Sequence, residues 1–386
     1  QARGVNDGWG FGVLIADAQE AWYLETLSGH QWVAVRIPDN KYFVAANGAG
    51  QIQGYEPDKY SYLLSSYKGI NPITFATNSN FAHFENEIFN FRASYGDVQR
   101  ATNRNSNYVR MAYAQHFFNP STQPFNQSVL NQNAFPMLLT PEHPITIEEL
   151  KTLQASHYQD FPEFDPYLSS VKEESDRPFY YPIANLRTSN AHITEIAAEL
   201  IDHDYAISNL EYIALGMPTI SFYLPIYYGL TTIPSQLKGA NHKADNRSLF
   251  WQFRKLQTLV FWSDPDKHIP FEFITRQAYI YKHYEALYKV IAAKQAQLEQ
   301  KYAALKDPKL IDTFTQETVD AVSQLNQQLI DYFMHDLDIE NQYHLTTTHE
   351  QNQWFTRAAR QQDCFYRRYR CDPEFNMSLS RRDKYV

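Results

Sequence analysis

The sequence predicts an α+β protein, because segments patterned like strands and segments patterned like helices occupy different parts of the chain. Short apolar runs separated by turn residues fill residues 10–47. A second set of short apolar runs, interrupted by Gly and Pro, fills residues 177–233. Beyond them, residues 248–335 have apolar side chains three and four positions apart, which is the spacing of amphipathic helices.

The first block, residues 10–47, is predicted to be an antiparallel meander. Its runs are rich in Val, Ile, Trp and Tyr, and breaks at residues 17–19 and 38–40 are typical of tight hairpins. Gly29 suits a bulge or a second turn. Asn47 ends the last run, beside a glycine-rich stretch. A side-chain amide there can donate a hydrogen bond to a developing oxyanion, but an asparagine also starts turns, and the spacing alone favours the turn.

The middle of the chain contains three predicted helices. Residues 54–70 have the apolar spacing of one short amphipathic helix. Residues 107–118 form a second helix, which a proline ends. Arg110 lies beside its apolar face, and the pattern by itself indicates a surface arginine. Thr146 and Glu149 have the spacing of a capping box that opens the third helix.

The last part of the chain is predicted to be helical and then extended. Residues 248–260 have one apolar face. Residues 273–305 and 310–335 are predicted to form a helical hairpin that covers a sheet or makes an oligomer contact. The remaining residues are polar and charged and are predicted to form an extended tail. The predicted parts of the chain are residues 1–270, 271–336 and 337–386.

Composition narrows the possible partners. The net charge is −9 and no basic stripe is present, so nucleic acid is not expected as a partner. No apolar run reaches about 18 residues, so a membrane-spanning helix is not expected. Two cysteines, Cys364 and Cys371, are too few for a four-ligand zinc site. A disulfide between them would indicate an exported, periplasmic or extracellular protein, whereas free thiols would not.

Several motifs follow one another in a fixed order. They are Ile15–Trp22, Gly29–Trp32, Asn107–Arg110 and Arg187–His192. Their order, over roughly residues 9–305, resembles peptidase family C69, the cysteine dipeptidases of the N-terminal-nucleophile (Ntn) hydrolase class. The family usually has Pro-Asn-Gln where this chain has Ala46-Asn47-Gly48.

The resemblance implies a fold and a set of site residues. The fold would be a four-layer αββα sandwich, with residues 1–270 as the downstream part of that domain. Asn47 would stabilise the oxyanion, and Arg110 would hold the nucleophile or the substrate. Arg187 is a candidate for binding the substrate carboxylate, unless it is a buried arginine paired with Asp or Glu. His192, in the same motif, is a second substrate-binding candidate. Neither a metal nor another cofactor is expected.

The resemblance also implies a missing partner. The family's nucleophile is an N-terminal cysteine followed by about 150 residues that the match does not include, and Gln1 has no thiol or hydroxyl. We therefore expect the downstream chain of an autoprocessed dipeptidase, inactive alone, with an upstream Cys-led chain, a dipeptide substrate and a homo-oligomeric state. One alternative is an acylamide hydrolase of the bile-salt or penicillin-V amidase type, with aromatic residues 75–91 lining a larger pocket. The other is a non-catalytic binding or scaffold protein.

Overall fold

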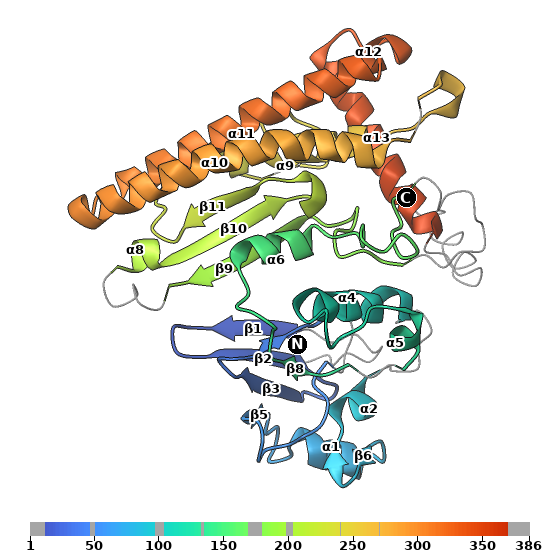
Figure 1. Cartoon of the computed structure of the whole chain (residues 1–386), viewed down its shortest axis with the longest axis vertical. Helices are drawn as coiled ribbons and strands as arrows, with labels where there is room; N and C mark the ends of the chain where they lie inside the picture. Colours follow the sequence, from blue (N-terminus) through green and yellow to red (C-terminus); the bar gives the residue numbers. More distant parts are fainter. Residues whose placement is uncertain are drawn as a thin grey trace. The chain divides into compact units, whose positions relative to one another are not determined.

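The chain folds into two compact units, each with its own sheet and helices (Figure 1). The computed structural model describes residues 12–46, 51–96, 104–132, 135–168, 180–197, 204–239, 241–269 and 271–369. Unit 1 comprises residues 1–149 and 180–182, and unit 2 comprises residues 150–179 and 183–386. The α+β prediction is confirmed.

Unit 1 is built on a four-stranded antiparallel sheet in the order β1-β2-β3-β5. Its strands are β1 (Gly12–Ala16), β2 (Ala21–Thr26), β3 (Trp32–Ile37) and β5 (Tyr62–Leu64). The hairpin predicted at residues 17–19 is confirmed, whereas the one predicted at residues 38–40 is not, because the run that follows those residues does not pair with β3. Asp17 Oδ1 accepts hydrogen bonds from the backbone N–H of Gln19 and Glu20 and closes the first. Gly29, with φ 69°, forms the second turn, because a positive φ favours glycine.

Two predictions for unit 1 are wrong. The last run of the meander forms β4 (Tyr42–Phe43), which leaves the sheet and pairs with β8 (Leu138–Leu139). Residues 54–70 contain strand β5 in place of the predicted helix. The open edge of β3 supplies the backbone partners, since Arg36 N–H donates to the Ser61 carbonyl at 3.0 Å. Pairing with a distant strand therefore outweighs the helical spacing of the apolar residues.

The core of unit 1 lies on one face of its sheet. Tyr23, Val33 and Val35 pack there with residues from the helices α1 and α2, such as Ala76 and Phe91. The remaining elements of unit 1 are α1 (Pro72–Asn78), β6 (Phe84–Glu85), β7 (Ile88–Phe89), α2 (Phe91–Tyr95), the π-helical turn η1 (Arg104–Tyr108), α4 (Val109–Phe118) and α5 (Gln127–Gln132). Helix α6 (Ile147–Gln154) begins in unit 1 and continues into unit 2, and its predicted capping box is confirmed.

Unit 2 contains the predicted second sheet, which is antiparallel in the order β11-β10-β9. Its strands are β9 (Asn190–Ile196), β10 (Asn209–Leu215) and β11 (Tyr223–Tyr227), and the short helix α8 (Tyr205–Ser208) precedes β10. Three predicted helices are confirmed as α9 (Leu249–Val260), α10 (Phe273–Leu305) and α11 (Lys309–Asp336). They lie together over one face of this sheet (Figure 1), where Tyr227 of β11 packs against Phe314 of α11.

The sheet and the α10–α11 hairpin belong to the same compact unit. The structure differs from the predicted extended tail, because residues after 337 form α12 (Ile339–Gln342) and α13 (Thr348–Tyr369). Trp354, Phe355, Ala358 and Ala359 are buried, and the Ala359 carbonyl accepts a hydrogen bond from Arg254 of α9. This narrow apolar stripe stabilises α13 within an otherwise polar sequence.

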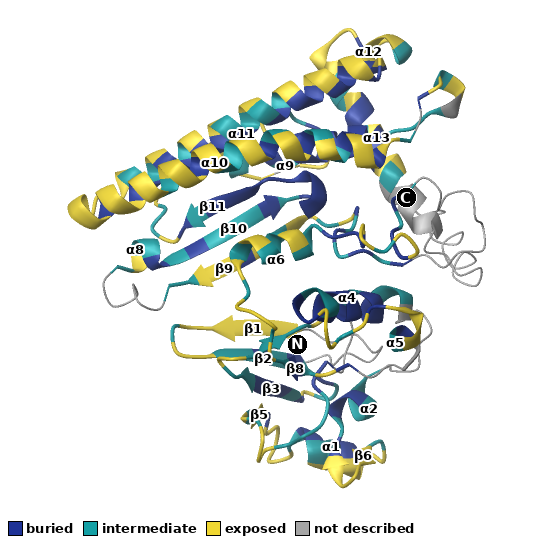
Figure 2. Ribbon diagram, in the orientation of Figure 1, coloured by how far each residue is buried: buried dark blue, intermediate teal, exposed yellow. Residues whose placement is uncertain are grey.

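Burial differs sharply between strands (Figure 2). Strand β11 is largely buried and β3 is buried at three of its six positions, whereas all five residues of β1 are exposed. Within the part of the chain that the structure describes, no helix combines the length and the apolar character needed to cross a membrane.

Candidate active site

The predicted oxyanion residue, Asn47, lies outside the described residues, which resume at Gln51. Glu25 of β2 is 1% exposed, and its carboxylate accepts hydrogen bonds from two backbone N–H groups. Gln51 N lies 3.2 Å from Oε1 and 3.0 Å from Oε2, and Ile52 N lies 3.1 Å from Oε2. A buried carboxylate needs such donors in place of water. Glu25 therefore fixes the backbone shortly after Asn47.

No role was predicted for Glu25, although the sequence contains a signal for its burial. Tyr23, Glu25 and Leu27 alternate along β2 and the turn after it, and all three are buried. Since side chains two positions apart in a strand share one face, the carboxylate is placed on the core face. A carboxylate at such a position must have a buried polar partner.

The next residue along the same segment, Gln53, connects it to two other parts of unit 1. Its carbonyl accepts a hydrogen bond from Phe91 N–H at 2.8 Å, at the start of α2. Its side-chain amide donates to the carbonyl of Phe135. Residues 51–53 are thus held at three successive positions.

Arg92 of α2 is buried, and its guanidinium packs against Tyr108 and Phe135. Its guanidinium carbon is 5.1 Å from the ring centroid of Tyr108 and 5.8 Å from that of Phe135. The two rings are 5.4 Å apart. The cation is attracted by the faces of both rings, and the attraction is strong because water is excluded. No sequence pattern distinguished Arg92 from a surface arginine.

Arg110 is in the first turn of α4, directly after the π-helical turn η1. Its Nε donates to the Ser106 carbonyl at 2.6 Å, and Nη2 donates to Asn107 Oδ1 at 2.8 Å. The residue is half-buried, and both of these bonds go to the turn that precedes it. A guanidinium fixed in this way presents its hydrogen-bond donors in one orientation. π-Helical turns occur often at functional sites.

The structure brings Arg110 and the flank of Asn47 into one neighbourhood of unit 1. Tyr108 precedes α4 and contacts Phe135, and Phe135 in turn accepts a hydrogen bond from Gln53. Each link joins segments that are distant in sequence. Arg92 of α2 contacts Tyr108, which lies two residues before Arg110, so α2, α4 and residues 51–53 meet around Phe135.

The two predicted substrate-binding residues are in unit 2. Arg187 is exposed, which excludes the buried-arginine alternative, and its backbone N–H donates to Asn185 Oδ1 at 2.8 Å. His192 is exposed on β9, opposite Ile213 of β10. Their roles stay predictions.

Unit 2 also holds a buried His157–Asp165 pair, with Nδ1 and Oδ2 2.9 Å apart. Tyr167 and Phe273 pack against the imidazole. Because both side chains are buried among aromatic residues, we assign the pair a structural role in the core of unit 2. Among the described residues, no three His, Cys, Asp or Glu side chains are grouped in a way that could hold a metal ion.

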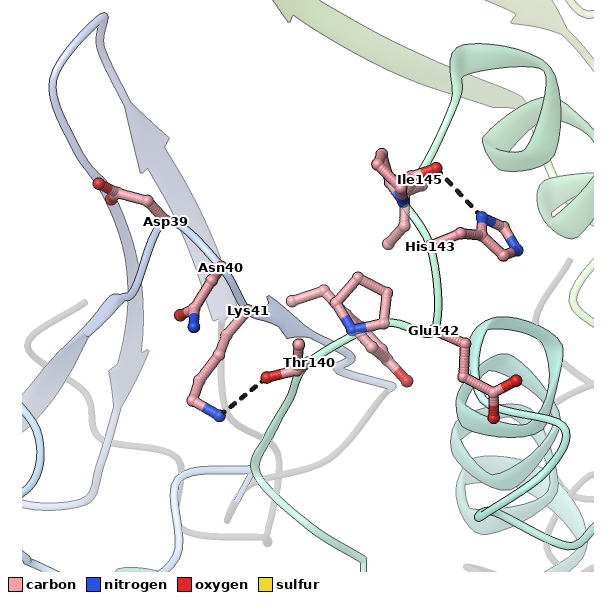
Figure 3. A pocket seen from close by; sticks show the side chains of 10 residues that line it. Asp39, Asn40, Lys41, Thr140, Glu142, His143 and Ile145 are labelled. Carbon is pink, nitrogen blue, oxygen red and sulfur yellow. Dashed lines mark hydrogen bonds between the residues drawn. The ribbon is translucent and has the colours of Figure 1, made fainter.

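An open hollow of about 530 Å³ lies on unit 1, between residues 39–42 and 140–145 (Figure 3). Lys41 Nζ donates to Thr140 Oγ1 across it at 3.3 Å. Burial raises the pKa of Tyr42 well above its usual value, so the hydroxyl stays protonated and donates to Asn119 Oδ1 at 2.7 Å. Among the described residues, Arg110, Arg187 and His192 do not line this hollow.

Comparison with known proteins gives one consistent result. Residues 3–268 match the profile of Peptidase family C69. A "Probable dipeptidase" of Salmonella dublin is 38% identical over 224 residues, which cover 58% of this chain and 48% of that protein. A "Probable dipeptidase B" of Lactococcus lactis is 29% identical over 243 residues, 62% of this chain and 48% of that protein. A "Dipeptidase" of Bifidobacterium longum is 26% identical over 256 residues, 64% of this chain and 46% of that protein. The chain spans about half the length of these relatives.

Proposed function

Because the chain belongs to peptidase family C69, we propose that it is the downstream portion of a cysteine dipeptidase, which hydrolyses dipeptide amide bonds by thiol acyl transfer. The observation that carries the proposal is the family match over residues 3–268. The relatives from three genera, all named as dipeptidases, support it. Since the chain spans about half of each relative, the activity belongs to a larger enzyme to which this chain contributes.

The proposal includes the αββα sandwich of Ntn hydrolases as the fold of that enzyme. Such a sandwich needs two sheets, each with helices on one face. Two features support it. In unit 1, helices α1 and α2 contribute to the core on one face of an antiparallel sheet. In unit 2, helices α9, α10 and α11 lie over one face of a second antiparallel sheet.

The proposed reaction forms and breaks a thioester. The thiolate of an N-terminal cysteine, on an upstream chain of about 150 residues, attacks the dipeptide carbonyl carbon. The α-amine of that cysteine accepts the thiol proton and gives it to the leaving amine. Water then attacks the thioester, releases the first amino acid and restores the thiol. Neither a metal nor another cofactor takes part in this chemistry.

Four residues of this chain have roles in the proposal. Asn47 donates a hydrogen bond to the oxyanion of each tetrahedral intermediate. Arg110, held by Ser106 and Asn107, orients the nucleophile or the substrate through paired hydrogen bonds. Arg187 is exposed, as a residue that binds a free substrate carboxylate must be, and His192 contributes to the same binding.

The first test is the intact mass of the natural enzyme under denaturing conditions. We expect a second chain of about 150 residues that begins with cysteine, and dipeptide hydrolysis by the assembled protein but not by this chain alone. Hydrolysis of conjugated acyl amino acids without dipeptide hydrolysis would favour the amidase alternative. If the sample contains no second chain and hydrolyses neither substrate, the alternative of a non-catalytic scaffold protein is favoured.

The second test uses variants of the assembled enzyme. Asn47→Ala should lower kcat by about 10²–10³-fold, the usual loss of one oxyanion donor. Arg110→Ala should also lower turnover. The matched control is Arg247→Ala, because Arg247 is a surface arginine paired with Asp245, and it should leave turnover unchanged. Full activity in Asn47→Ala or in Arg110→Ala would show that the role proposed for that residue is wrong.

A further inference from the structure

Strand β1 has a surface that is unusual for the outermost strand of a sheet. Its five residues, Gly12–Ala16, are all exposed and carry no charge. Val13 is 45%, Leu14 69% and Ile15 52% exposed. Edge strands of soluble proteins normally carry charges, prolines or bulges that prevent further pairing. β1 has none of these.

The backbone of β1 is also open on one side. Among the described residues, its neighbour in the sheet is β2 alone. Asp17 N–H donates to the Glu20 carbonyl at 3.0 Å, and alternate residues of an antiparallel ladder exchange such bonds. In this register, the backbone N–H and C=O groups of Val13 and Ile15 face β2 and form hydrogen bonds with it. The N–H and C=O groups of Leu14 and Ala16 therefore point to the open edge.

The edge strand of unit 2 shows what a protected edge looks like in the same chain. β9 is also exposed, but it carries polar side chains, including His192, Thr194 and Glu195. Part of its outer backbone is already used, because the His192 carbonyl accepts a hydrogen bond from Gln154 Nε2 at 3.0 Å. The apolar open edge of β1 is therefore a specific feature of unit 1.

The C69 relatives are about twice as long as the part of them that this chain spans. We propose that a β-strand from the upstream part of the dipeptidase pairs with the open edge of β1, so that β1 becomes an internal strand. The inference rests on the proposed function and names the surface that binds the upstream chain.

The chemistry of β1 defines its partner. The register places Leu14 on the core face with Tyr23, and Val13 and Ile15 on the opposite face with Leu24 and Trp22. A strand that pairs here must be apolar on both faces, as internal strands are. Main-chain hydrogen bonds give the affinity, and the apolar side chains on either face give the register.

Hydrogen exchange of the wild-type chain tests the pairing directly. The probe is the part of the Salmonella dublin dipeptidase that precedes the region matching this chain, produced as a separate polypeptide. Its addition should slow exchange of the Leu14 and Ala16 amides by about tenfold or more, because the outward amides gain bonds. The Thr194 amide on the edge of β9 should not change.

A pair of variants tests the same contact by affinity. Leu14→Pro removes the outward N–H and leaves the bonds between β1 and β2, so it should weaken binding of the probe by about tenfold or more. Leu14→Val keeps the N–H and an apolar side chain and should bind as the wild type does. Thermal unfolding of both variants checks that they fold.

Each outcome decides the inference. Binding without protection of Leu14 and Ala16 would overturn it, and so would the absence of binding. Protection that depends on the concentration of this chain alone would also overturn it, because a second copy would then occupy the edge. Dipeptide hydrolysis by the mixture is measured separately. Protection without hydrolysis would support the pairing and refute the proposed activity. Hydrolysis without protection would support the activity and refute the pairing.

Discussion

The contact between Glu25 and residues 51–52 gives a quantitative prediction. Glu25→Ala removes the acceptor for two buried backbone N–H groups. Each buried donor left without a partner costs about 1–3 kcal/mol, so we expect a loss of about 2–6 kcal/mol in the free energy of unfolding. Glu25→Gln keeps one carbonyl oxygen, so its loss should be about 1–2 kcal/mol.

Urea denaturation of the chain measures this loss. Glu20 provides the matched control, since it is a partly exposed glutamate in the same hairpin and pairs with Arg36 at 3.2 Å. Exposed ion pairs contribute little, so Glu20→Ala should cost less than about 1 kcal/mol. A loss below about 1 kcal/mol in Glu25→Ala, or equal losses in both alanine variants, would refute the reasoning.

The same contact should influence catalysis in the assembled enzyme. Glu25 holds the backbone of residues 51–52, and if Asn47 acts as proposed, Glu25 is expected to act as a positioning residue. Glu25→Gln should lower kcat while KM changes little, because Asn47 is proposed to act on the oxyanion. A change confined to KM would contradict this role.

Three further predictions concern stability. Burial lowers the pKa of Lys255 from its ordinary value of 10.5 to about 8, and Nζ donates to the side chains of Asn246 and Asn352. The unfolded chain then binds this proton more tightly, so wild type should gain up to about 3 kcal/mol relative to Lys255→Met as pH rises from 8 to 10.5. If the free energy of unfolding in urea depends on pH in the same way for wild type and for Lys255→Met, this prediction is wrong. Thr146→Ala should cost about 1 kcal/mol, because it breaks the capping box of α6. The backbone N–H of Thr146 lowers the pKa of Glu149, so circular dichroism should show the box weakening as pH falls below about 4.5.

The sequence by itself determined the local elements whose residues carry their own signals. The hairpin after β1 follows from Asp17, and the start of α6 follows from Thr146 and Glu149. Helices α10 and α11 agree with their predicted bounds within one residue, because their apolar stripes are long and regular. The order of motifs also determined the family, which does not require knowledge of any contact.

Contacts between distant segments required the tertiary structure. Strand β5 exists because β3 has an edge to pair with, and α13 exists because α9 buries its narrow apolar stripe. The neighbourhood of Arg110 depends on Phe135 and Gln53 in the same way. Local spacing reports which faces of a segment are apolar, but the partner that covers each face lies elsewhere in the chain. Only the folded chain decides which partner that is, because the free energy of burial and of hydrogen bonding depends on both members of a contact.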